Sequence, residues 1–210
     1  VLIDAAQGVP HAQIDFTAFG ADFMAFSAHK MCGPTGIGAL LVQPDVFEQM
    51  EPFMGGGDMI ETVTIEGSTY QTNEHKFEAG TPRIAEAIGW TAALDWMETF
   101  DISAEHDRLI KIASWVAKSL RDLGMNVYGR HEDGDAAVVS FLHPTINSED
   151  MAHLLDARGF AVRTGHHCAQ PLLHRLGISG TVRASFYIYN TREEAEAFVS
   201  EIKEIVERFA

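Results

Sequence analysis

The chain carries the stretch FMAFSAHKMCGPTGIGALLV at residues 23–42, and this stretch decides the fold of its first part. The apolar run Phe23–Phe26 predicts a short strand, and Ile37–Val42, bounded by Gly and Pro, predicts a buried one. Between them, residues 27–34 are predicted to form a polar turn that carries Lys30. A lysine on a turn between two apolar strands is therefore the first feature to explain.

The neighbours of Lys30 suit a cofactor that is held by its phosphate and bonded covalently to a lysine. Ser27 and His29 supply hydroxyl and imidazole donors before it, and glycines follow it. A free lysine is almost fully protonated at pH 7, so it becomes a nucleophile or base only where its environment lowers its pKa. At the start of the chain, Asp4 ends an apolar strand and Gln7 follows it.

A buried carboxylate at Asp4, opposite a pyridine nitrogen, would keep that nitrogen protonated and make the ring an electron sink. The pattern of strand-Asp followed by strand-Ser-x-His-Lys is therefore a signal for pyridoxal phosphate. The alternative is that Asp4 caps a turn and Lys30 is a surface lysine in a loop.

A second cluster lies at residues 163–171, which read RTGHHCAQP. A glycine before Cys168 and a proline after it predict an exposed loop. A free thiol is only slightly ionised at neutral pH, and we expect the histidines and the arginine beside Cys168 to favour its thiolate. The alternatives are a packed thiol or part of a metal site. Because three consecutive ligands cannot easily surround one tetrahedral ion, we predict no metal.

Arg183 begins a predicted strand beyond this loop. Its guanidinium can hold a substrate carboxylate in a bidentate fork. The alternative is a surface ion pair, which is the commoner role of an arginine at a strand start.

Composition narrows the classes of protein to consider. The 210 residues are 46% hydrophobic and 21% charged, which excludes a disordered or fibrous chain. A formal charge of -15 argues against binding nucleic acid or an anionic membrane. No apolar run is long enough for a membrane span. The two distant cysteines, Cys32 and Cys168, indicate a reducing, cytoplasmic setting, and Cys32 is interpreted as a packing residue.

Charge also divides the chain into two parts. Residues 1–105 hold 16 acids and three bases, whereas residues 106–210 hold 14 acids and 12 bases. The first part alternates strand and helix signals, with a short helix predicted at 15–21, another starting at Pro44, a hairpin excursion over 50–80 and a helix from Pro82. In the second part, the predicted helices are 103–123, 148–157 and one from Thr191, and the predicted strands are 125–128, 136–142, 160–163 and 182–188.

Together these motifs resemble the cysteine desulfurases of the pyridoxal phosphate-dependent aminotransferase class V family, most closely the type II, SufS-like group. The RxGHHCA motif separates this group from the longer cysteine loops of type I. The stretches that carry the resemblance are residues 4–7, 27–30, 33–38, 55–57, 77–82, 163–171, 183–185 and 189–191. The resemblance implies an α/β protein of fold type I, with residues 1–100 as the C-terminal part of the large domain and 101–210 as an α+β small domain.

The resemblance also implies a role for each candidate residue. The implied cofactor-binding residues are Asp4 (pyridine nitrogen), Gln7 (ring hydroxyl), Ser27 and His29 (phosphate), Lys30 (covalent attachment) and Thr81 (phosphate of the neighbouring subunit). Lys30 would also shuttle the substrate Cα proton, and Cys168 would attack the substrate sulfur. Arg183 would grip the substrate carboxylate, and Arg163 would position the loop or touch the substrate. His166 and His167 are the candidates for proton handling.

The implied activity is that of an L-cysteine desulfurase, which converts L-cysteine to L-alanine and leaves a persulfide on Cys168 for iron–sulfur cluster assembly. The alternatives are a selenocysteine lyase, whose substrate differs in one atom, and a truncated, non-catalytic fragment. The implied partners are a sulfur-acceptor protein of SufE or SufU type and a second copy in a homodimer.

Full members of the family are about twice as long as this chain, and the chain opens on the apolar strand Val1–Asp4 without a Met. We expect the missing half to hold the Gly/Thr phosphate loop and the histidine that stacks on the ring. We therefore predict weak cofactor retention and little activity for this chain alone. Its visible absorbance, after incubation with pyridoxal phosphate and removal of the excess, measures this, and a persistent band of lysine-bound cofactor would contradict it.

Overall fold

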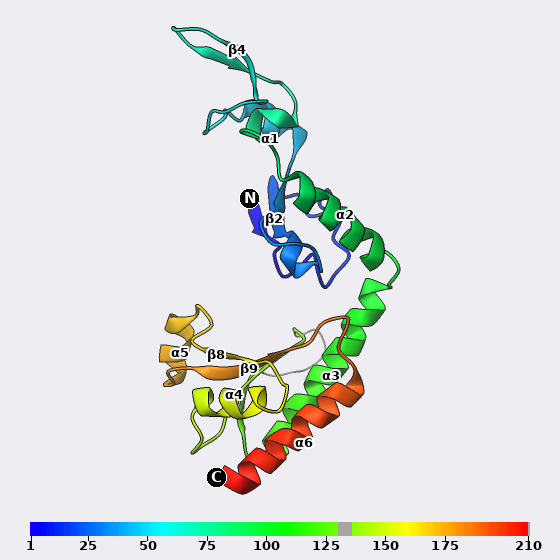
Figure 1. The fold of residues 1–210 in the computed structure, drawn as a ribbon, viewed down its shortest axis with the longest axis vertical. Coiled ribbons are helices and arrows are strands. Elements are labelled where there is room, and N and C mark those ends of the chain that lie inside the picture. The colour runs from blue at the N-terminus through cyan, green and yellow to red at the C-terminus, as the bar shows by residue number, and fades with distance from the viewer. Residues whose placement is uncertain (130–135, 210) are drawn as a thin grey trace. The chain divides into compact units, whose positions relative to one another are not determined.

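The computed structural model describes residues 1–129 and 136–209. The chain divides into two compact units, Val1–Ser103 and Ala104–Ala210. Figure 1 shows the elements of each. No helix in the described ranges is both long and apolar enough to cross a membrane.

The first unit is built on a small mixed sheet. Its elements are β1 (Leu2–Asp4), β2 (Phe23–Ser27), the 3-10 helix η1 (Ala28–Lys30), β3 (Gly38–Val42), α1 (Pro44–Gln49), β4 (Ile60–Val63), β5 (Ser68–Tyr70), the 3-10 helix η2 (Glu74–Phe77) and α2 (Ile84–Met97). The sheet order is β1-β2-β3, with β1 parallel and β3 antiparallel to β2. The predicted strands at both ends of the lysine turn are thus confirmed and pair with each other. The prediction that the second strand is buried is wrong, because Leu40 and Leu41 of β3 are 50% and 39% exposed.

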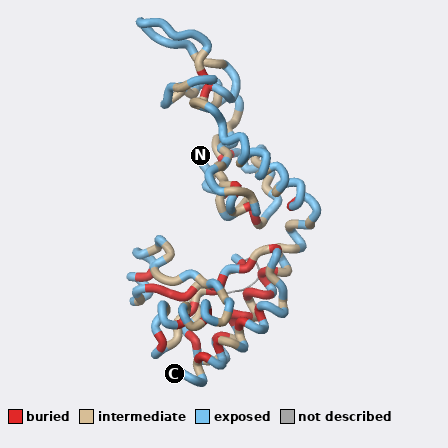
Figure 2. Tube along the Cα trace, viewed as in Figure 1, coloured by how far each residue is buried: buried red, intermediate tan, exposed pale blue. Residues whose placement is uncertain are grey.

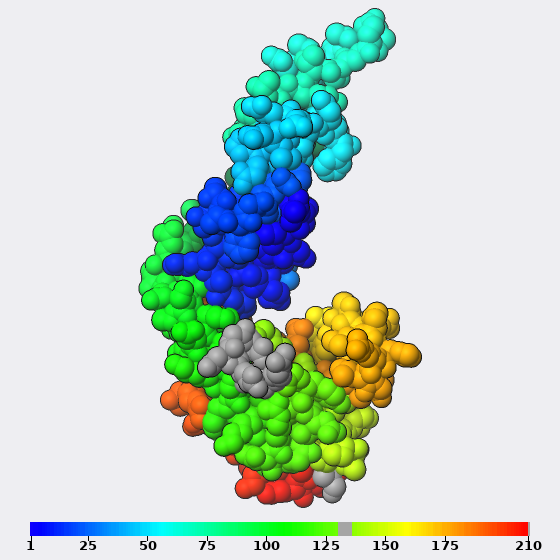
Figure 3. Space-filling model, turned by 180° about the vertical axis from the view of Figure 1, so that it is seen from behind, coloured from blue at the N-terminus to red at the C-terminus, as the bar shows by residue number. Residues whose placement is uncertain are grey.

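Strands β4 and β5 form a separate antiparallel hairpin, which extends from the rest of the first unit (Figures 1 and 3). The hairpin predicted within residues 50–80 is therefore confirmed. Helix α2, the last element of this unit, is apolar on nearly all sides, and only Met97 of its residues is buried. Trp90 of α2 packs edge-on against Phe26 of β2, with ring centroids 5.9 Å apart.

The second unit is an antiparallel sheet with helices. Its elements are α3 (Ile102–Asp122), β6 (Asn126–Tyr128), β7 (Val138–Leu142), α4 (Ser148–Asp156), β8 (Arg163–Gly165), α5 (Gln170–Leu176), β9 (Thr181–Ser185) and α6 (Arg192–Phe209). The sheet order is β6-β7-β9-β8. Helices α3, α4 and α6 agree with the sequence prediction to within one residue at their starts, because all three are amphipathic and two carry clear caps.

These caps are visible in the hydrogen bonds. Asn147 accepts the N–H groups of Glu149 and Asp150 at the start of α4. At the start of α6, the Glu194 N–H donates to Thr191 Oγ1 at 3.1 Å, and the Thr191 N–H donates to Glu194 Oε2 at 2.8 Å. This reciprocal pair is a capping box.

The core of the second unit lies between the helices and the sheet, where the buried residues gather along α3 and α6 (Figure 2). Its fully buried side chains include Leu109, Val116, Phe141, Ile202 and Ile205. Helix α6 contacts the sheet through Phe198, whose ring lies 6.3 Å from that of Phe141. This confirms the predicted arrangement of helices against a small sheet.

Two local predictions are wrong. Residues 15–21 form a turn and not a helix, because the Asp15 carboxylate accepts the N–H groups of Thr17 and Ala18 at 2.9 and 3.3 Å. The strand predicted at 160–163 begins only at Arg163, since the Phe160 N–H closes the end of α4 on Leu155 and the Phe160 ring packs on Phe198.

The turn that carries Lys30 depends on a glycine. A Cβ at Gly38 would lie 2.6 Å from the Phe26 carbonyl oxygen, which is backbone and cannot move aside. We predict that Gly38→Ala lowers the free energy of unfolding by about 1–3 kcal/mol. Gly89→Ala is the matched control, because a Cβ there meets only Pro34 at ordinary contact distance, and helix propensity favours alanine by about 0.8–1 kcal/mol. Urea unfolding measures both, and equal stability of the two variants would contradict the prediction.

Candidate active site

Five of the predicted site residues follow the carboxyl ends of two parallel strands. β1 ends at Asp4 and β2 ends at Ser27, and because the strands are parallel these ends lie at the same edge of the sheet. His29 and Lys30 follow directly in η1, and Gln7 lies in the turn after β1. Asp4 is exposed and not buried as expected, and its Oδ1 accepts the N–H of Ala6 at 3.0 Å, as the turn-capping alternative predicts. The structure therefore brings the carboxylate, amide, hydroxyl, imidazole and amine to one edge.

The turn that holds Lys30 is organised around Ala28, which is fully buried. The Ala28 carbonyl accepts the N–H groups of Met31 at 2.8 Å and Gly33 at 2.9 Å, and the Ala28 N–H donates to Ile37. None of the ion pairs found within residues 1–129 and 136–209 involves Lys30. The backbone bonds of the turn thus fix the main chain at Lys30, and no carboxylate of the described residues pairs with its ammonium group.

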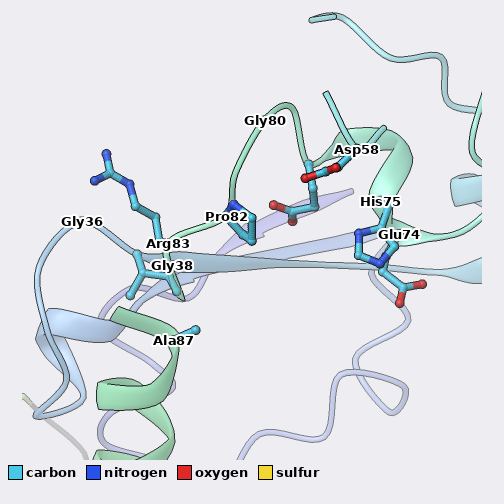
Figure 4. Close-up of a pocket in the computed structure, with 11 residues that line it drawn as sticks. Gly36, Gly38, Asp58, Glu74, His75, Gly80, Pro82, Arg83 and Ala87 are labelled. Atoms are coloured by element: carbon cyan, nitrogen blue, oxygen red, sulfur yellow. The ribbon is translucent and has the colours of Figure 1, made fainter. Parts of the chain in front are cut away.

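Thr81 lies outside this sheet, in the segment between η2 and α2. Thr81 lies between Gly80 and Pro82, which line a separate cavity of about 570 Å³. Asp58, Glu74 and His75 lie toward one end of this cavity, and Gly36 and Arg83 lie toward the other (Figure 4). None of the other five predicted cofactor-binding residues lines this cavity.

Cys168 lies on a short loop between β8 and α5, and its side chain is exposed. Two consecutive residues of this loop, His167 and Cys168, have φ angles of 53° and 60°, in the left-handed region that is costly for residues other than glycine. The loop holds itself locally through His166, whose Nδ1 accepts the Cys168 N–H and whose carbonyl accepts the Ala169 N–H. The thiol is therefore presented on a strained, defined turn.

Arg163 and Arg183 are direct partners across β8 and β9, so their side chains project from the same face of the sheet. Arg163 Nη2 donates to Cys168 Sγ at 3.7 Å. Neither guanidinium takes part in an ion pair in the part of the chain that the structure describes. Burial lowers the pKa of Arg183, and the charge of Arg163 adds to this effect. Two unneutralised guanidiniums beside a thiol form a site for an anion.

His167 is anchored to β9. Its Nε2 lies 3.1 Å from the carbonyl oxygen and 2.9 Å from Oγ1 of Thr181. Burial lowers the pKa of His167, and the positive charges of Arg183 and Arg163 lower it further, while the bond to the Thr181 backbone acts in the opposite direction. The imidazole is therefore held in its neutral form near neutral pH.

Sequence reasoning missed Thr181, because the strand was predicted to start at Val182. It also missed α5, although Pro171 near its start and Gly177, with a φ of 71°, after its end are ordinary helix signals. Cys32 was interpreted as packed but is exposed, with a φ of 57°. No group of three or more potential metal ligands is found among the described residues.

The profile of the aminotransferase class-V family matches residues 1–198, so the chain belongs to this family. A probable cysteine desulfurase of Staphylococcus epidermidis is 42% identical over 211 residues, which cover 100% of this chain and 51% of the relative. A cysteine desulfurase of Haloferax volcanii is 42% identical over 215 residues, covering 100% of this chain and 50% of the relative.

Solved structures agree with this family. The cysteine desulfurase CsdA (S-sulfonic acid) from Escherichia coli matches with a TM-score of 0.93 at 38% identity, covering 100% of this chain and 52% of that chain. The predicted class, an α/β portion of a fold type I transferase, is therefore confirmed. The chain spans about half the length of the curated relatives it matches.

The lowered pKa of His167 predicts that the protein loses stability in acid. The unfolded imidazole, with a pKa of about 6.5, binds a proton that the folded one resists, so the free energy of unfolding falls as the pH drops below about 6.5. His167→Gln removes this contribution and flattens the pH dependence between pH 7 and 5. Urea unfolding at a series of pH values measures it, and identical slopes in the two proteins would show that His167 is not the group responsible.

Proposed function

We propose that the chain is part of a pyridoxal phosphate-dependent L-cysteine desulfurase in which Cys168 receives the sulfur as a persulfide. The observation that carries this proposal is the arginine pair beside the thiol. Arg183 and Arg163 offer charge to a carboxylate, and Arg163 also contacts Cys168 Sγ at 3.7 Å. A thiol beside a binding site for a small carboxylic acid suits an amino acid whose own sulfur is to be attacked.

The residues at the edge of the first sheet fit pyridoxal phosphate by their chemistry. The Asp4 carboxylate can accept from a protonated ring nitrogen, and the Gln7 amide can bond the ring hydroxyl. Ser27 and His29 would hold the phosphate, and Lys30, which has no carboxylate partner among the described residues, would hold the cofactor covalently through its ε-amine. When bound, the cofactor supplies an electron sink for negative charge next to the amino-acid Cα. We also propose that Thr81 binds the cofactor phosphate of a neighbouring subunit.

The protein residues would then perform three tasks. Arg183 binds and orients the substrate carboxylate, with Arg163 beside it, and Lys30 moves the Cα proton. The Cys168 thiolate attacks the sulfur of L-cysteine, so that an S–S bond forms as the C–S bond breaks. The electron pair of the broken bond stays on the substrate carbon, which takes up a proton to give L-alanine. The transferred sulfur is oxidised and the carbon is reduced, so no external oxidant is needed.

The exposure of Cys168 supports delivery of the sulfur to a second protein. We include in the proposal an acceptor of SufE or SufU type, a homodimeric enzyme and a role in iron–sulfur cluster assembly. Both cysteines are free thiols, as a reducing compartment such as the cytoplasm requires. In this scheme residues 1–100 belong to the large domain, and residues 101–210 form the small domain that carries the cysteine loop.

We predict that Cys168→Ser abolishes persulfide formation from L-cysteine, because serine offers no sulfur nucleophile. Cys32→Ser is the matched control: the residue is also an exposed thiol with a positive φ, but it lies in the first unit. Mass spectrometry of the protein supplied with pyridoxal phosphate and L-cysteine detects one added sulfur atom on Cys168, and amino-acid analysis detects alanine.

Four outcomes separate the possible functions. Persulfide and alanine in Cys32→Ser but not in Cys168→Ser support the proposal. Persulfide transfer that survives in Cys168→Ser shows that the nucleophile is wrongly assigned. If the wild-type chain forms no persulfide even in a single turnover, the non-catalytic fragment is supported. A higher kcat/KM for selenocysteine than for cysteine would instead favour the selenocysteine lyase.

A further inference from the structure

Thr181 is a buried polar residue at the point where the cysteine loop leaves the sheet. It is 2% exposed and is the first residue of β9, directly opposite Gly165 at the end of β8. The chain before it approaches β8 closely, since a Cβ at Gly180 would lie 3.1 Å from Gly165. Thr181 is thus held rigidly against the base of the loop that carries Cys168.

The contact between Thr181 and His167 fixes where the imidazole carries its proton. A carbonyl oxygen can only accept, so His167 Nε2 must donate to the Thr181 carbonyl, and Oγ1 at 2.9 Å accepts the same N–H. Neutral His167 is therefore protonated on Nε2. Its Nδ1 is left as a bare acceptor that is buried and has no hydrogen-bond partner in the described ranges.

The contact between His167 and Thr181 joins the cysteine loop to a strand far along the chain, whereas the bonds to His166 stay within the loop. His167 and Cys168 both have left-handed backbone angles, which persist only where the surroundings enforce them. The bonds from Cys168 and Ala169 to His166 lie within the loop itself. The pair His167–Thr181, in contrast, spans 14 residues and ties the strained turn to β9.

The charged groups around His167 require a neutral imidazole. Arg163 faces it from β8, Arg183 from β9, and His166 from the same loop. A second proton, on Nδ1, would bring another positive charge against two guanidiniums. Burial and these charges lower the pKa of His167, so the neutral anchor is the form present at neutral pH.

We propose that Thr181 is a positioning residue: by accepting the Nε2–H of His167 with both oxygens, it maintains the left-handed turn that sets Cys168 beside Arg163. The inference rests on the proposed function, because it assigns importance to the position of Cys168 as sulfur acceptor. Its geometry, however, can be tested without cofactor or substrate.

The test compares Thr181→Val, which loses Oγ1 at nearly constant shape, with Thr181→Ser, which keeps it. Iodoacetamide alkylates Cys168 by forming an S–C bond as iodide leaves and the thiol proton goes to solvent. In Thr181→Val the turn relaxes, Cys168 Sγ loses its hydrogen bond from Arg163, and alkylation of Cys168 at neutral pH slows about threefold to tenfold, as expected for one hydrogen bond. Thr181→Ser restores the wild-type rate.

Cys32 is the internal control, because it lies in the first unit and its alkylation rate stays unchanged in both variants. NMR gives a second readout: the Nε2-bound proton of His167 exchanges faster with water in Thr181→Val than in Thr181→Ser. If Thr181→Val does not fold, His167→Phe replaces it as the test, because it changes the half-buried loop residue and leaves the strand intact. We expect this variant to slow the alkylation of Cys168 in the same way.

Equal Cys168 rates in wild type and Thr181→Val, or a slowing that Thr181→Ser shares, would overturn the proposal. These readouts are independent of the proposed function. A chain that forms no persulfide but shows the alkylation and exchange differences refutes the desulfurase activity and keeps the positioning role.

Discussion

Two guanidinium groups held in register on adjacent strands are the constraint on which the cysteine site depends. Like charges directly opposite each other destabilise a sheet, and neither Arg163 nor Arg183 has an ion-pair partner among the described residues. Burial and the charges of both arginines lower the pKa of His167, so that its imidazole adds no third positive charge to the pair near neutral pH. The unneutralised charge gives the site its preference for an anion and gives the Cys168 sulfur a cationic neighbour.

In the first unit, the backbone fixes the position of Lys30, and no ion pair among the described residues neutralises its charge. Parallel pairing of β1 and β2 places Asp4 and Ser27 at one edge of the sheet, and the buried Ala28 organises the turn in which Lys30 follows. Close packing of Gly38 against the Phe26 carbonyl ties that turn to β3. The backbone, and not an ion pair, therefore holds Lys30 in place. This leaves its amine available for the chemistry proposed.

Much of this was predictable from local patterns. The amphipathic period of α3 and the capping box of α6 located those helices, and the residues of the lysine turn and the cysteine loop indicated their chemistry. One prediction failed because a distant contact decided the outcome. Phe160 looked like the start of a strand, but its ring packs on Phe198 of α6, and the strand begins three residues later. Cys32 is predicted to be a packed residue, yet it lies exposed on a turn and has a positive φ.

Local sequence patterns are sufficient to show which reactive groups the protein has and on which kind of segment each lies, because strand and helix periods and turn residues are local properties. They also placed Lys30 after a strand and Cys168 in a loop. Only the tertiary structure decided that Arg163 faces Arg183 and that Thr181 holds His167. Both contacts join residues well separated along the chain, and strand register, which places β8 against β9, is set by the packing of the whole sheet.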